Sequence, residues 1–196
     1  SYSEIGRQGS GRYGIGLLYD LGGGQDTYAS LRMSQGFGAI GVGVLADDGG
    51  DDTYVAEAAV QGSGVFGLGL LYDGGGNDHY TTWAYGQGFG YVGSAGLLYD
   101  HDGNDVYWSD PGRDFGGTTL YYSPQLADGQ GNSSFTQGAA FGLRDDTNGE
   151  YFAGGIGTLR DADGADVYTA GVFAEGTGYM EGTGILADGG GDDTSE

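Results

Sequence analysis

Seven leucine–aspartate pairs, in each of which the leucine stands two residues before the aspartate, recur along the chain at nearly regular intervals within glycine-rich stretches. These pairs are Leu18/Asp20, Leu45/Asp47, Leu71/Asp73, Leu98/Asp100, Leu126/Asp128, Leu159/Asp161 and Leu186/Asp188. Their aspartates, called the anchor aspartates below, follow one another at intervals of 27, 26, 27, 28, 33 and 27 residues. Self-similarity at a fixed period of this size is typical of a solenoid, whose repeats bury their apolar faces only against their neighbours. The sequence therefore predicts a stack of similar coils.

Each repeat divides into a strand, a tight turn, a second strand and a glycine-rich corner. A glycine and a leucine precede six of the seven anchor aspartates by four and two residues, so both lie on one face of an extended strand. After the turn, a second aspartate stands two residues before a tyrosine that opens the next extended run; these tyrosines are Tyr28, Tyr54, Tyr80, Tyr107 and Tyr168. We therefore expect an all-β fold, a parallel β-solenoid (β-helix) of about seven coils with roughly 27 residues per coil. Leucine from one wall and tyrosine from the other should fill its thin interior.

The composition excludes several classes of protein. The 196 residues include 47 Gly, 2 Pro and no Cys, which rules out the strict triplet of collagen and a disulfide-stapled scaffold. The formal net charge of −22 disfavours nucleic acid and anionic membrane surfaces as partners, because both are negatively charged, and it favours cations. No apolar stretch is long enough to span a bilayer, so we expect no membrane insertion.

We interpret residues 1–196 as a single β-solenoid segment. Coils 1–107 and 153–196 follow the repeat, whereas 108–152 contains both prolines and is expected to form irregular, loop-bearing coils. In this alignment Ser133 and Phe135 take the places of the second aspartate and the tyrosine in a degenerate turn. The polar column seven residues after each tyrosine then runs through Gln35, Gln61, Gln87, Asp114 and Glu175.

The chain begins and ends in mid-repeat, and neither end carries a polar capping element. Uncapped ends of a solenoid expose backbone groups and apolar core. We therefore expect the segment to belong to a longer chain or to an assembly, with self-association through the uncapped solenoid ends.

The paired aspartates are candidate metal ligands. Stacking the coils about 4.8 Å apart places equivalent carboxylates in two rows, where like charges raise one another's pKa values. A hard divalent cation between successive coils would relieve that repulsion, since Ca²⁺ takes oxygen ligands from carboxylates and carbonyls in flexible geometry. The alternative is that these residues form turns by accepting backbone N–H bonds without a metal. The candidate ligands are Asp20, Asp26, Asp47, Asp52, Asp73, Asp78, Asp100, Asp102, Asp105, Asp161, Asp163, Asp166, Asp188 and Asp193.

The turn segments also carry a family resemblance. The best examples are Gly74-Gly75-Gly76-Asn77-Asp78-His79-Tyr80 and Asp102-Gly103-Asn104-Asp105-Val106-Tyr107, with weaker ones at 22–28, 49–54 and 163–168. They resemble the glycine- and aspartate-rich nonapeptide of the repeats-in-toxin (hemolysin-type) calcium-binding family. The resemblance implies an extracellular Ca²⁺ site with Asp78, Asp105 and Asp166 as ligand candidates. It does not extend to that family's coil, in which two tandem nonapeptides make a turn, because only one such loop occurs in each coil here.

We expect an extracellular or cell-surface structural or adhesive protein of bacterial or archaeal origin, stabilised by cations and able to assemble end to end into filaments or a surface layer. The alternative is a carbohydrate-binding or carbohydrate-active β-helix with a glycan as partner. Its site would lie near residues 108–152, around Trp108, Asp110, Arg113 and Asp114. Catalysis is less favoured, because His79 and His101 have no accompanying serine or cysteine motif.

One more apolar pattern falls on the outer side of the predicted strands. Residues directly before the anchor aspartates include three tyrosines, Tyr19, Tyr72 and Tyr99. Four aliphatic residues share that outer side, Leu17, Val44, Leu70 and Leu97. An exposed apolar stripe of this kind indicates a covered or interacting surface.

Overall fold

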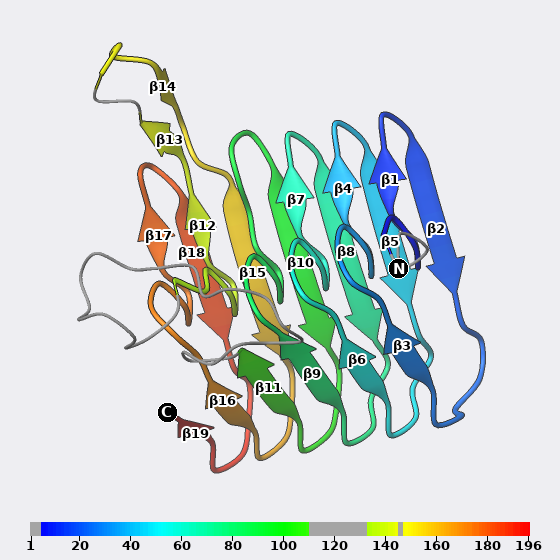
Figure 1. The fold of residues 1–196 in the computed structure, drawn as a ribbon. Coiled ribbons are helices and arrows are strands. Elements are labelled where there is room, and N and C mark those ends of the chain that lie inside the picture. The colour runs from blue at the N-terminus through cyan, green and yellow to red at the C-terminus, as the bar shows by residue number, and fades with distance from the viewer. Residues whose placement is uncertain (1–4, 110–132, 145–146) are drawn as a thin grey trace.

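The computed structural model describes residues 5–109, 133–144 and 147–196. Over these residues the fold is all-β, a parallel β-solenoid whose main sheets hold six strands each, which corresponds to about six turns (Figure 1). The chain winds from one end of the stack to the other, and each full coil passes through three walls. The predicted fold class is confirmed.

Each wall is named here after the residue type that marks it. The leucine sheet contains β2 (Ile15–Tyr19), β5 (Val42–Ala46), β8 (Leu68–Asp73), β10 (Ala95–Asp100), β15 (Ile156–Asp161) and β18 (Thr183–Ala187). The tyrosine sheet contains β3 (Thr27–Ala29), β6 (Thr53–Val55), β9 (His79–Thr82), β11 (Val106–Ser109), β16 (Val167–Thr169) and β19 (Thr194–Ser195). The glycine wall contains the short strands β1 (Gly11–Arg12), β4 (Gly38–Ala39), β7 (Gly64–Val65), β12 (Ala140–Phe141) and β17 (Gly178–Tyr179), joined through bridges at Gly90.

The parallel register keeps each residue type in its own column. In the leucine sheet Leu71 pairs with the equivalent leucines of both neighbouring strands, Leu45 and Leu98. In the tyrosine sheet Tyr80 pairs in the same way with Tyr54 and Tyr107. Identical side chains therefore lie directly over one another along the stack.

Leucine and tyrosine fill the interior, as the alternation in the sequence predicts. Leu45, Leu71, Leu98 and Leu159 are fully buried, and they pack against the column of five tyrosines from Tyr28 to Tyr168. Neighbouring tyrosine rings are stacked with centroids 4.8–5.0 Å apart and planes within 9° of parallel. Each fully buried side chain of this size stabilises the fold by about 1.5–3 kcal/mol relative to exposure.

Glycine is required where the glycine wall meets the leucine sheet. A Cβ at Gly43 would lie 2.1 Å from the carbonyl oxygen of Phe37, and one at Gly69 would lie 2.0 Å from that of Ser63. The two walls are also joined by hydrogen bonds, for example from the Leu70 amide to the Gly36 carbonyl at 3.0 Å. The column of glycines four residues before the anchor aspartates is thus explained by backbone packed on backbone.

The middle of the chain follows a different alignment from the one that the sequence suggested. β15 pairs directly with β10, so the described sheet has six rungs, and the seventh pair, Leu126/Asp128, lies outside the described residues. Gln137, not Asp114, continues the glutamine column, because its Nε2 donates to the carbonyl of Tyr107 at 3.0 Å. Asp114 itself lies outside the described residues.

Residues 133–141 consequently belong to the regular stack, and Phe135 lies in a different column from the one assigned above. Its ring stacks on those of Phe173 and Tyr85 beside the glycine wall, away from the tyrosine column. β13 (Leu143–Arg144) and β14 (Tyr151–Phe152) do leave the stack: they form an antiparallel pair that projects beyond it (Figure 1).

The close wall-to-wall contact predicts a sharp difference between two alanine substitutions. Gly69→Ala places its Cβ against a backbone oxygen, so we expect a loss of about 2–3 kcal/mol in unfolding free energy, seen as a lower thermal midpoint. Gly22→Ala should leave the midpoint unchanged, because no atom lies within 4 Å of its added Cβ. Circular dichroism during heating measures both, and equal midpoints would contradict the packing argument.

Candidate metal centre

Two rows of aspartates run along one edge of the solenoid, on either side of the turn that joins the leucine and tyrosine sheets. The anchor aspartates end or directly follow the strands of the leucine sheet, at Asp20, Asp47, Asp73, Asp100, Asp161 and Asp188. The turn aspartates directly precede the strands of the tyrosine sheet, at Asp26, Asp52, Asp78, Asp105, Asp166 and Asp193. In the inner coils, from Asp47 to Asp166, every member of both rows is no more than 1% exposed.

Tyrosine hydroxyl groups hold the anchor aspartates. Tyr54 donates to Oδ2 of Asp73 at 2.5 Å, and Tyr80 donates to Oδ2 of Asp100 at 2.5 Å. The same bond to the anchor of the next coil joins Tyr28 to Asp47, Tyr107 to Asp161 and Tyr168 to Asp188. The Tyr28 hydroxyl also donates to Oδ2 of Asp20, in its own coil, at 3.2 Å. The core tyrosines therefore tie neighbouring coils together with a polar bond as well as by stacking.

The other oxygen of an anchor aspartate shapes its own turn. Oδ1 of Asp47 accepts from the Gly49 amide at 2.9 Å, and Oδ1 of Asp73 accepts from the Gly75 amide at 2.9 Å. This is the turn chemistry of an aspartate that accepts an N–H two residues ahead. For these anchor aspartates, hydrogen bonds satisfy both oxygens without a metal.

The turn aspartates are bonded on one oxygen only. Oδ1 of Asp78 accepts from the backbone amide of Asp52 at 2.6 Å, and the pattern repeats along the row at 2.7–3.0 Å. Oδ2 has no hydrogen-bond partner and is buried in four consecutive members, Asp52, Asp78, Asp105 and Asp166. A buried carboxylate oxygen without a partner is costly, because it has lost its water and gained nothing in return.

The arrangement of these oxygens suits a hard cation. Ligand atoms of the two rows gather within 4.8 Å of one another in five groups: Asp20/Asp26/Asp47, Asp52/Asp73/Asp78, Asp78/Asp100/Asp105, Asp105/Asp161/Asp166 and Asp166/Asp188/Asp193. Ca²⁺ binds oxygens at about 2.3–2.6 Å, so three oxygens at that separation can reach one ion. Asp78, Asp105 and Asp166 each belong to two successive groups, which links the last four groups into a continuous row, whereas the first group shares no member with the others.

The structure brings together twelve of the fourteen sequence-predicted ligands and leaves two apart. Asp102 and Asp163 are exposed and line a shallow polar groove on the outer side of the turns, together with Asn77 and Asn104. They belong to none of the described groups of three. The tyrosine two residues later marks the turn aspartates, and neither of these two residues has it.

Burial changes the acidity of the row. Desolvation raises the pKa of Asp52 to about 6 and that of Asp78 to about 8, with added repulsion from Asp47 and Asp73 respectively. Desolvation also raises the pKa values of Asp100, Asp105 and Asp161. Hydrogen bonds from backbone amides oppose the shifts without cancelling them. The charged forms of these carboxylates are therefore disfavoured near neutral pH unless something compensates their charge.

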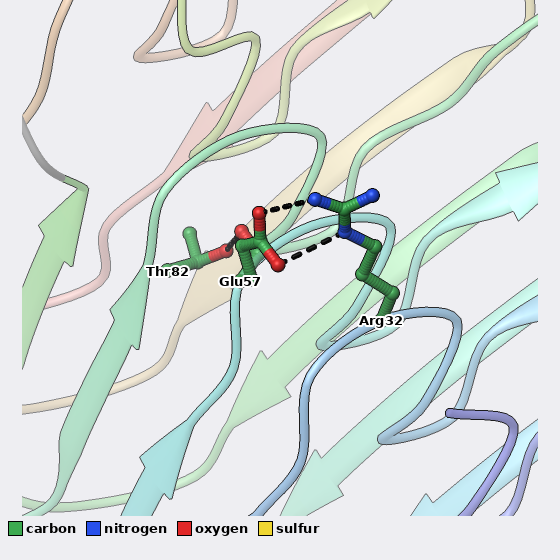
Figure 2. Close-up of polar contacts among 3 residues, drawn as sticks. All are labelled: Arg32, Glu57 and Thr82. Atoms are coloured by element: carbon green, nitrogen blue, oxygen red, sulfur yellow. Dashed lines mark hydrogen bonds and ion pairs between the residues drawn. The ribbon is translucent and has the colours of Figure 1, made fainter. Parts of the chain in front are cut away.

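A separate ion pair stabilises the corner between the tyrosine sheet and the glycine wall. Glu57, 2% exposed, accepts from Arg32 of the preceding coil through Nε at 2.9 Å and Nη2 at 2.6 Å (Figure 2). Thr82 of the following coil donates to the Glu57 carbonyl at 3.2 Å. The repeat does not reveal this contact, because Leu31 and Trp83 occupy the positions that match Glu57 in the neighbouring coils.

Comparison with known proteins gives no family for the chain: no family model, curated protein or solved structure matches it. The resemblance to the repeats-in-toxin family therefore rests on the turn residues alone. Within residues 5–109, 133–144 and 147–196, no helix has the length and hydrophobicity needed to cross a membrane.

The raised pKa values predict how stability depends on pH. An unfolded aspartate ionises near pH 4, so in the absence of cations the folded state loses stability as the pH rises from about 4 through about 6 to 8. We expect the thermal midpoint in chelator to be at least about 5 °C lower at pH 9 than at pH 5. Ca²⁺ should restore it at pH 9 and have little effect at pH 5. A midpoint in chelator that is flat or rises over this range would contradict the burial argument.

Proposed function

We propose that the protein is an extracellular structural repeat protein whose coils are held together by Ca²⁺, or a similar hard divalent cation, bound along the aspartate rows. The observation that carries the proposal is the run of four buried Oδ2 atoms without a partner in Asp52, Asp78, Asp105 and Asp166. A hydrogen bond from the backbone amide of the equivalent aspartate in the preceding coil accounts for Oδ1 of these residues but leaves Oδ2 without a role. A cation gives it one.

The electrostatics support cation binding over protonation of the carboxylates alone. Inner-coil carboxylates of both rows are almost completely buried in a chain of net charge −22, with no lysine and six arginines. Each divalent ion would neutralise two charges and bond oxygens from neighbouring coils at once. The stabilisation is greatest where calcium is abundant, and extracellular calcium modules bind in the range of about 10⁻⁴–10⁻³ M.

The architecture supports a structural or adhesive role. A stack of coils tied by tyrosine–aspartate bonds, amide columns and shared ions is stiff and is extended by adding repeats. The outermost described groups, which contain Asp20 and Asp193, are more open than the inner ones. A further coil, from this chain or from another copy, could complete them, and end-to-end assembly into filaments or a surface layer would use these groups.

The carbohydrate alternative depends on residues that fall largely outside the described part of the chain. Asp110, Arg113 and Asp114 lie there, while Trp108 is half-buried in β11 and pairs with Thr81 and Thr169. The solenoid fold itself is compatible with either role.

Terbium provides a direct test of the metal site. Tb³⁺ replaces Ca²⁺ at oxygen sites and emits when a nearby tyrosine is excited, and the hydroxyl of Tyr80 lies 2.5 Å from an oxygen of Asp100. We expect bright emission that Ca²⁺ displaces. Asp78→Asn removes a ligand shared by two groups and should weaken Ca²⁺ binding at both, lowering the bound ions by about two per chain or the affinity by at least about tenfold.

The matched control is Asp102→Asn, in the same turn system but outside the described groups of three. It should bind Ca²⁺ as the parent protein does, in emission and in titration calorimetry. Equal binding by the two variants, or no binding by the parent protein at millimolar Ca²⁺, would remove the metal from the proposal.

The structural role has its own test. Electron micrographs of the purified protein in Ca²⁺ should show ordered particles or end-to-end fibres that chelator disperses. Isolated particles that look the same with and without chelator, combined with specific binding on a glycan array, would favour the carbohydrate alternative instead.

A further inference from the structure

The outer face of the leucine sheet is almost wholly apolar. Side chains alternate along its strands, so three residues of each strand point away from the core. Of these eighteen outward positions fifteen are apolar, two are threonine, one is arginine and none is acidic. The positions, together called the outer leucine face, are Ile15, Leu17, Tyr19, Val42, Val44, Ala46, Leu68, Leu70, Tyr72, Ala95, Leu97, Tyr99, Ile156, Thr158, Arg160, Thr183, Ile185 and Ala187.

This face is open to solvent in the inner coils as well as at the ends. Leu68 is 41% exposed and Ile156 is 49% exposed, although both have neighbouring coils on either side. Monomeric proteins rarely expose apolar patches of more than a few hundred Å². Six strands spaced about 4.8 Å apart, each about five residues of 3.3 Å long, give a face of about 500 Å².

An adjacent corner extends the apolar surface at a conformational cost. Ile40 and Phe66 lie between the glycine wall and the leucine sheet, 51% and 49% exposed, with φ of 46° and 48°. Positive φ is unfavourable for a β-branched residue, and glycine would adopt it without strain. An isoleucine there contributes apolar surface that the turn itself does not need.

Charge separates this face from the rest of the molecule. The carboxylates of the two aspartate rows lie along the turn edge. The single charged residue of the outer leucine face is Arg160, whose guanidinium lies 5.1 Å from the Tyr99 ring centroid. A chain of net charge −22 repels its own copies, and an acid-free face is where two copies can meet with least repulsion.

We propose that the outer leucine face is a self-association interface, on which a second copy of this chain packs sheet against sheet. Two such faces remove about 1,000 Å² from solvent, about the least expected of a biological interface, and the corner residues Ile40 and Phe66 add to it. A flat face with the same column spacing in both copies is self-complementary about a twofold axis, and sheets pack face to face at about 10 Å. The proposal does not rest on cation binding.

The test introduces a positive charge at one outward position of the apolar face. Light scattering during size-exclusion chromatography in chelator, where end-to-end assemblies are dispersed, should give the parent protein the mass of a dimer at about 100 µM. Leu70→Lys should elute as a monomer with an unchanged circular dichroism spectrum. Its matched control, Thr81→Lys, lies on the outward side of β9 in the tyrosine sheet and should stay dimeric.

A second measurement does not depend on weakening the interface. The chain has no cysteine, so Leu70→Cys and Thr81→Cys each introduce a single thiol. A bismaleimide that spans about 10 Å should link copies of Leu70→Cys efficiently and copies of Thr81→Cys poorly. A monomeric parent protein, equal cross-linking of the two variants, or a monomer that floats with zwitterionic lipid vesicles would each overturn the proposal, the last in favour of a lipid surface.

Discussion

The parallel register, one coil per step, is the constraint on which the rest of the structure depends. It places identical side chains about 4.8 Å above one another, a spacing that suits stacked aromatic rings and does not suit a row of like charges. The tyrosine column gains from it, with ring centroids 4.8–5.0 Å apart. The aspartate rows have the same spacing, because glycine-to-backbone contacts between the glycine wall and the leucine sheet fix the coils in place. The acidic rows must therefore be compensated where they stand, by hydrogen bonds, protons or cations.

The two hypotheses for the aspartates, turn formation and metal binding, divide largely by row, although Asp161 of the anchor row also has a buried oxygen, Oδ1, without a partner. Anchor aspartates such as Asp73 use one oxygen for the turn amide of Gly75 and the other for the hydroxyl of Tyr54, which leaves little of their bonding capacity unused. Turn aspartates such as Asp78 use one oxygen for a neighbouring amide and keep the other buried and unpartnered. The metal hypothesis is therefore strongest for the turn row, with the anchor row as supporting ligands whose tyrosine bonds fix their orientation.

The sequence predicts the stack, its register and the two aspartate rows, because each depends on a residue type that recurs at a fixed interval. It fails where an interval is broken: Tyr107 and Gln137 are thirty residues apart, so Asp114, at the usual spacing of seven, was assigned the position that Gln137 holds. The sequence does not predict the tyrosine–aspartate bonds, because each tyrosine bonds the anchor aspartate of the next coil. The repeat pattern alone does not show which coil's aspartate a tyrosine reaches. Asp102 was included among the ligands because composition alone does not separate the two sides of a turn, whereas the backbone path does.

Cation binding and self-association act on the same electrostatic balance, although they involve different surfaces. If each of the five described groups holds one divalent ion, the net charge changes by +10, from −22 to −12. Repulsion between two copies grows with the square of their charge, so this change lowers it to roughly a third. Screening at physiological salt, over about 8 Å, already weakens the interaction between distant turn edges. The apolar face therefore supplies the attraction in either state, and ions in the rows make the approach easier chiefly at low ionic strength.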